Sequence, residues 1–225
     1  MPVRSAESWF NQLGPITKYS MILSVGMTVC VHMNWLADMY YVLNWDKISQ
    51  SFELWRLMTN LVYFGRFDLG FICNLAFYVI YQSKLEDQFV GRIADYVMML
   101  LFTCTIMTAV AYFLQIPLLS NAVLIMLLWV WCRTNEDLHT IFLGMQMPPP
   151  YIPWVLFAIH VLMGGNFVHD LVGIFAGHLY VNLAVILPVT RSIRLLETPA
   201  FMYKLFPPST YSYRRSAGQG RNLDD

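Results

Sequence analysis

Long apolar runs with few charges dominate the chain, and they restrict its fold more than any other feature. Of the 225 residues, 57% are hydrophobic and only 12% are charged, about half the charged share of a soluble domain. A helix that crosses the roughly 30 Å bilayer core needs about 20 apolar residues. The apolar runs lie at 19–37, 69–82, 94–114, 117–132, 152–164 and 170–190. This pattern predicts an all-α membrane protein with six transmembrane helices.

The charge balance excludes one broad class of function. Lys plus Arg (14) equals Asp plus Glu (14), so the formal net charge is zero. A nucleic-acid-binding protein that works through a basic surface needs an excess of positive charge. We therefore expect no nucleic-acid partner, and the lipid bilayer is the expected surrounding of the chain.

The distribution of Lys and Arg orients the six predicted helices. With the N-terminus in the cytosol, eleven basic residues fall on the cytosolic side and three on the opposite side, which agrees with the positive-inside rule. The three lie in the link between the first two helices: Lys47, Arg56 and Arg66. Both termini are therefore expected in the cytosol. We divide the chain into a cytosolic N-terminal segment (1–18), a six-helix membrane domain (19–190) and a cytosolic tail (191–225).

Two of the runs look too short to cross an ordinary bilayer. Residues 69–82 and 152–164 give about 20 Å of helix at 1.5 Å per residue. Short helices thin the bilayer around them; alternatively, the second helix begins earlier, near Met58. The link at 38–68 is half apolar, so we expect it to lie in the membrane interface, where Trp and Tyr are favoured.

Polar side chains at membrane depth gather on the later helices. They are Gln115, Asn121, His160, Asn166, His169, Asp170, His178 and Asn182. For any one of them the simplest role is an interhelical hydrogen bond, worth about 0.6 kcal/mol. As a group they favour a hydrated cavity, in which we place Asn121, Asp170 and His178. Zinc bound by His160, His169 and His178 is not expected, because positions 169 and 178 lie on opposite helix faces. No metal and no cofactor is predicted.

The sixth run contains Gly173 and Gly177 in a GxxxG pattern. Two glycines one turn apart let the backbone of a neighbouring helix approach closely. The pattern is common in membrane helices, and alone it indicates only packing.

Six helices with GxxxG on the sixth resemble the rhomboid superfamily. Active rhomboid proteases carry a serine in a Gly-x-Ser-Gly turn at the start of the fourth helix. Their histidine lies on the sixth helix, three residues before the first glycine. Here Ser120 lacks both flanking glycines, Asp170 occupies the histidine position, and His169 is one residue out of register. The resemblance implies a rhomboid-like fold with no catalytic residue; an active intramembrane serine protease that uses Ser120 is the alternative.

Further motifs narrow the resemblance to one branch, the Derlin family. Trp55-Arg56 in the first link looks like that family's Trp-Arg motif. Other matching stretches begin at Gly91-Arg92, Trp129, Tyr151, Gly177-His178 and Thr198-Pro199. The resemblance extends over about 5–208 and therefore covers nearly the whole chain.

The resemblance implies a function. Derlins are catalytically inactive rhomboid-like proteins of the endoplasmic reticulum membrane, and they help misfolded proteins return to the cytosol for ubiquitination and proteasomal degradation. The implied partners are misfolded clients, a membrane E3 ubiquitin ligase complex, the cytosolic AAA ATPase called valosin-containing protein, and further copies or relatives in an oligomer. Short helices that thin the bilayer and a polar groove fit this function, because both lower the free-energy barrier to moving an unfolded polypeptide through lipid.

Derlin tails often end in an ATPase-binding motif: an aromatic residue, then Gly-x-Gly, then Leu. Gly218, Gly220 and Leu223 match this motif, whereas Ala217 stands in the aromatic position. Whether the tail binds the ATPase directly therefore stays open.

A small transporter is a third class of function. Transporters often contain inverted repeats and broken helices. No convincing repeat relates 1–110 to 111–225, and this disfavours the transporter.

Overall fold

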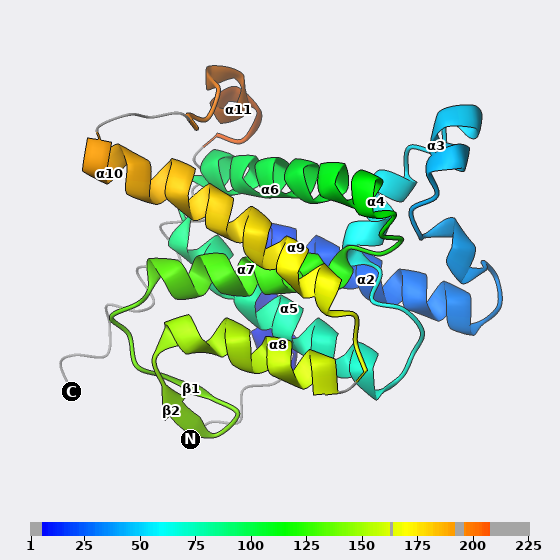
Figure 1. Ribbon diagram of the computed structural model, residues 1–225, viewed down its shortest axis with the longest axis horizontal. Coiled ribbons are helices and arrows are strands. Elements are labelled where there is room, and N and C mark those ends of the chain that lie inside the picture. The colour runs from blue at the N-terminus through cyan, green and yellow to red at the C-terminus, as the bar shows by residue number, and fades with distance from the viewer. Residues whose placement is uncertain (1–5, 163, 192–195, 208–225) are drawn as a thin grey trace.

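The chain folds into a bundle of helices that lie roughly side by side (Figure 1). The computed structural model describes residues 6–162, 164–191 and 196–207. The first half contains α1 (Ala6–Gln12), α2 (Pro15–His32), the 3₁₀ turn η1 (Asp38–Tyr40), α3 (Trp45–Ser51), α4 (Arg56–Val62), α5 (Leu69–Gln88) and α6 (Ile93–Leu114). The second half contains α7 (Ser120–Thr134), β1 (Thr140–Phe142), β2 (Met145–Met147), η2 (Pro149–Tyr151), α8 (Ile152–Leu162), α9 (Phe167–Tyr180), the π-helix η3 (Val181–Ile186), α10 (Leu187–Arg191) and α11 (Ala200–Leu205).

A helix stands at each of the six apolar runs, with shifted ends. The expected shortness of the second run is wrong, because α5 continues through polar residues to Gln88 and has 20 residues. It also does not begin near Met58, which lies in the separate helix α4. The fifth run is short as expected, since α8 has 11 residues.

Two helices in the described part of the chain are both long and apolar enough to cross a membrane. They are Ile93–Leu114 and Phe167–Arg191, the second of which joins α9, η3 and α10 into one continuous helix. The apolar helices α7 and α8 fall below that length. Six crossings therefore stay a prediction.

Helix α7 lies at the centre of the bundle. Every residue from Ala122 to Cys132 is buried, and α9 and α5 pack closely against it. A helix that is apolar on all sides belongs in a core. Helices α2 and α6 instead expose large apolar side chains, including Ile22, Leu23, Leu101 and Phe113. An exposed apolar belt of this kind suits contact with lipid.

The described residues are mostly helical, as expected, with one short hairpin among the helices that was not expected. Strands β1 and β2 pair antiparallel, with Thr140 opposite Met147 and Phe142 opposite Met145. Leu143 and Gly144 join them with φ of 49° and 83°. Two positive φ angles are what a type I′ turn requires.

A carboxylate from α5 holds the start of α2. Glu86, 2% exposed, accepts hydrogen bonds from the backbone N–H of Ile16 (3.0 Å) and of Thr17 (2.9 Å), and from the Thr17 hydroxyl (2.7 Å). The two N–H groups belong to the first turn of α2 and have no acceptor inside their own helix. A Cβ at Gly14 would lie 2.1 Å from the Glu86 Cδ atom, so a larger residue there would displace the carboxylate from these donors.

We predict that Glu86→Ala lowers the free energy of unfolding by about 1–3 kcal/mol, because it leaves the buried donors of α2 unpaired. Denaturation of the purified protein in mixed detergent micelles would measure this change. Glu136→Ala is the matched control, since Glu136 is 46% exposed at its side chain. Equal stability of the two variants would contradict the role given to Glu86.

Candidate functional site

Four polar side chains from four helices form one hydrogen-bonded cluster, which we call the polar cluster: Asn74 of α5, Asn121 of α7, His160 of α8 and Asp170 of α9. The Asn74 amide donates to the Asn121 side-chain oxygen (3.2 Å). His160 Nε2 lies 3.3 Å from the Asn74 oxygen, and His160 Nδ1 lies 3.1 and 3.2 Å from the two carboxylate oxygens of Asp170. His160 therefore bridges α5 and α9.

One member of the polar cluster, Asp170, is buried, and the other three are half-buried. Asp170 as a whole residue is 1% exposed, and the side chain of His160 is 12% exposed. Polar groups placed inside a membrane bundle are costly unless they pair, and they often mark a functional path. Here the pairing holds α8, the shortest of the six helices, to its two neighbours at one end of the bundle.

The structure brings together two of the three predicted cavity residues. Asn121 and Asp170 belong to the polar cluster, whereas His178 does not. It lies eight residues after Asp170, is exposed, and packs edge-on against the Trp129 ring with centroids 5.9 Å apart. Eight residues advance a helix by about 12 Å, which carries His178 away from the cluster.

Asn74 was missed by the sequence analysis. It is a single amide near the start of an otherwise apolar run and belongs to no motif. Its hydrogen bonds to Asn121 of α7 and His160 of α8 depend on tertiary packing, which no local pattern encodes.

Ser120 does not have the surroundings of a nucleophile. It is fully buried, and its hydroxyl has no hydrogen-bond partner among the described residues. A serine nucleophile needs a base within hydrogen-bond reach, yet both ring nitrogens of His160 are engaged by the polar cluster. Within the described ranges no group of three or more His, Cys, Asp or Glu residues could hold a metal ion.

Arg56 is buried inside the first link and ties it together. Its guanidinium bonds the carbonyls of Met39 and Val42 (2.9 Å to Val42) and pairs with Glu53 at 2.5 Å. The side chain is 0% exposed, so backbone carbonyls and a carboxylate are its partners, and it is not placed to bind a lipid phosphate. Trp55, its neighbour at the start of α4, is 52% exposed. One residue of the motif organises the link, and the other faces outward.

The two glycines of the GxxxG pattern face α7. A Cβ at Gly173 would lie 2.3 Å from the Ala122 carbonyl oxygen. A Cβ at Gly177 would lie 3.1 Å from the Trp129 ring and 3.3 Å from the Met126 carbonyl oxygen. The contact at Gly173 is with backbone, which cannot move aside as a flexible side chain can. This seam between α7 and α9 is thus closed to any larger residue at 173.

The remaining predicted residues, Gly218, Gly220 and Leu223, lie outside the described residues.

Comparison with known proteins gives one consistent family. The family model described as the Der1-like family matches residues 13–200. The chain is 34% identical to Derlin-2.1 of Zea mays over 216 residues, which cover 90% of this chain and 87% of that protein. It is 33% identical to Derlin-2 of Oryza sativa subsp. japonica over 230 residues (96% and 92%). It is 30% identical to Derlin-1 of Caenorhabditis elegans over 197 residues (85% and 80%). The chain therefore belongs to the Der1-like family, the Derlins.

Proposed function

We propose that this chain is a non-catalytic retrotranslocation factor of the endoplasmic reticulum membrane. Membership of the Der1-like family implies a membrane protein with a role in endoplasmic-reticulum-associated degradation. The finer proposal is that the membrane domain offers a path by which misfolded lumenal and membrane proteins reach the cytosol. Its partners are then these clients, a membrane E3 ubiquitin ligase complex and the valosin-containing ATPase, in a homo- or hetero-oligomer.

The polar cluster is the observation that carries this proposal. An unfolded segment brings unpaired backbone N–H and C=O groups into the bilayer, and each unsatisfied group costs several kcal/mol there. Asn74, Asn121, His160 and Asp170 supply donors and acceptors on four different helices. A passing chain can exchange hydrogen bonds with such groups, and the cluster reforms after it has left.

The short helices next to the cluster support the same path. The 15 residues of α7 and the 11 of α8 span about 22 and 16 Å at 1.5 Å per residue. Both lengths fall short of the roughly 30 Å hydrocarbon core, so lipid beside α8 must thin. A thinner apolar layer lowers the cost of moving polar chain past this side of the bundle.

One experiment separates this function from the protease alternative. Replacement of Ser120 by Ala should leave client degradation unchanged, and a fluorophosphonate probe should not label Ser120, because its hydroxyl has no base. Pulse-chase of a misfolded client in cells that carry only the variant would measure the first result. Stabilisation of the client by Ser120→Ala, together with activity-dependent labelling of the wild type, would replace our proposal with a protease.

We predict that both termini face the cytosol. Lys47→Asn completes a glycosylation acceptor with Ser49 in the first link, beside exposed Asp46. Arg214→Asn does the same with Ser216 in the tail. The first acceptor should receive a glycan in microsomes and the second should not. Glycosylation is read as a mobility shift on a gel that a glycosidase removes. A glycosylated tail would contradict the six-helix topology.

We predict that Arg56→Ala slows client degradation several-fold at similar protein abundance. Loss of the guanidinium frees two carbonyls and so disorders the first link, while the helices outside the link keep their contacts. Arg66→Ala is the matched control: it lies in the same link, is 78% exposed at its side chain and pairs with Asp38. Pulse-chase of client and variant in the same cells measures both rates. If the abundance of the Arg56→Ala variant falls as much as client degradation does, Arg56 serves only the folding of the protein.

We predict that Gly173→Val stalls clients, because overpacking the seam typically costs about 1–3 kcal/mol and pushes α9 away from α7. Asp170 sits one turn away from Gly173, so the polar cluster would lose its geometry. Gly26→Val is the control, because a Cβ at Gly26 meets nothing within 4 Å. Unchanged client turnover with abundant Gly173→Val protein would contradict a role for the seam.

A further inference from the structure

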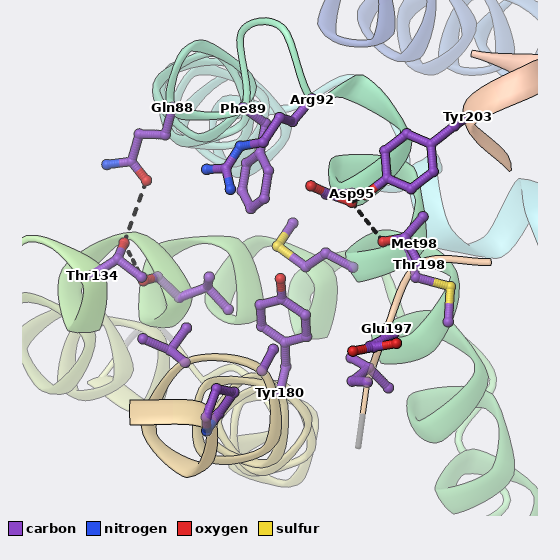
Figure 2. A pocket seen from close by; sticks show the side chains of 16 residues that line it. Gln88, Phe89, Arg92, Asp95, Met98, Thr134, Tyr180, Glu197, Thr198 and Tyr203 are labelled. Carbon is purple, nitrogen blue, oxygen red and sulfur yellow. Dashed lines mark hydrogen bonds between the residues drawn. The ribbon is translucent and has the colours of Figure 1, made fainter. Parts of the chain in front are cut away.

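A cavity of about 690 Å³ lies at the end of the bundle opposite the polar cluster. The end of α5, the start of α6, the end of α7, the end of α9 with η3 and α10, and the tail segment 196–203 line this open cavity (Figure 2). By the predicted topology this end faces the cytosol, at the level of the lipid headgroups. Nothing in the proposed path uses this cavity.

Asp95 holds the tail segment in place as one wall of the cavity. Its Oδ1 atom accepts hydrogen bonds from the Thr198 hydroxyl (2.6 Å) and from the Tyr203 hydroxyl (2.5 Å). The bond to Asp95 raises the pKa of the Tyr203 phenol, so the phenol stays a donor at any physiological pH. Glu197, next to Thr198, is exposed and lines the cavity.

Three charged side chains line this cavity, Arg92, Asp95 and Glu197, and the Asp95 carboxylate is already engaged by the hydroxyls of Thr198 and Tyr203. The Arg92 guanidinium lies over the Phe89 ring, 5.8 Å from the ring centroid. Among the described residues neither Arg92 nor Glu197 forms an ion pair. Figure 2 shows Arg92 on one side of the cavity and Glu197 on the other. A cavity with a positive and a negative group held apart is complementary to a zwitterion.

Uncharged polar side chains also line the cavity. The Gln88 and Thr134 side chains lie on the same side of the view as Arg92 and are bonded to each other at 3.4 Å. The Tyr180 hydroxyl points into the space between the two charges. Donors of these kinds, with an Arg, are suited to a phosphate ester.

We propose that this cavity binds a zwitterionic phospholipid headgroup, with the phosphodiester at Arg92 and the ammonium at Glu197. The apolar lining supports a lipid over a soluble phosphate ester: Met98, Val185 and Leu196 also face the cavity. Val185 and Val189, which follow each other by one turn, are 38% and 83% exposed and lead outward along the helix surface. An acyl chain can lie along this surface while its headgroup stays in the cavity.

Native mass spectrometry of the full chain in detergent tests the proposal. The probes are dioleoyl-phosphatidylethanolamine and dioleoyl-phosphatidylglycerol, added in equal amounts; the second has the phosphodiester but no ammonium. The wild type should retain phosphatidylethanolamine in preference. Arg92→Gln should retain about tenfold less of both lipids, the loss expected for one charge-assisted hydrogen bond. Glu197→Gln should keep phospholipid and lose the preference between the two.

Arg133→Gln and Glu136→Gln are the matched controls. These residues form an ion pair of 2.8 Å with each other near the end of α7, and neither lines the cavity. Both controls should bind lipid as the wild type does, and all four variants should melt within a few degrees of it. Wild-type retention and preference in Arg92→Gln and Glu197→Gln would overturn the proposal. Displacement of the lipid by soluble glycerophosphoethanolamine at equal concentration would overturn its assignment to a lipid.

Discussion

The backbone contact of α9 on α7 is the interaction on which the rest of the structure depends. Gly173 leaves no room for a Cβ, since that atom would meet the Ala122 carbonyl oxygen at 2.3 Å. This close approach fixes what lies on either side of the seam. Asp170 enters the polar cluster three residues before Gly173, and Tyr180 enters the headgroup cavity three residues after Gly177. The two ends of one helix thus supply the two candidate sites.

Much of the fold could be predicted, because membrane helices are recognisable in a sequence as long runs of apolar residues. The apolar runs predicted the positions of six helices, and the GxxxG pattern predicted a close helix contact, which the structure places against α7. The Derlin resemblance from short motifs is confirmed by the match to the Der1-like family over residues 13–200. The ends of helices were harder to predict. Helix α5 continues past its apolar run to Gln88, and its Glu86 bonds to the start of α2, 70 positions away in the sequence.

The candidate sites were only partly predictable. Asp170 and Asn121 stood out as polar residues at membrane depth, and they do lie in one cluster. Their bridge, Asn74, carries no signal of its own, and His178 was grouped with them although the helix carries it two turns away. The hairpin at Thr140–Met147 was missed because its turn uses Leu143 at positive φ, a position where glycine or asparagine would have indicated a type I′ turn.

Site-specific crosslinking to a stalled misfolded client tests the central claim, that polar chain passes beside the polar cluster. A photoreactive amino acid would replace Ile72 of α5 or Val161 of α8, both exposed and close in sequence to Asn74 and His160. Leu101 of α6 is 47% exposed and serves as a lipid-facing control. We predict that the client crosslinks strongly to positions 72 and 161 and weakly to 101. Equal crosslinking at all three positions, or a stronger signal at 101, would contradict the account.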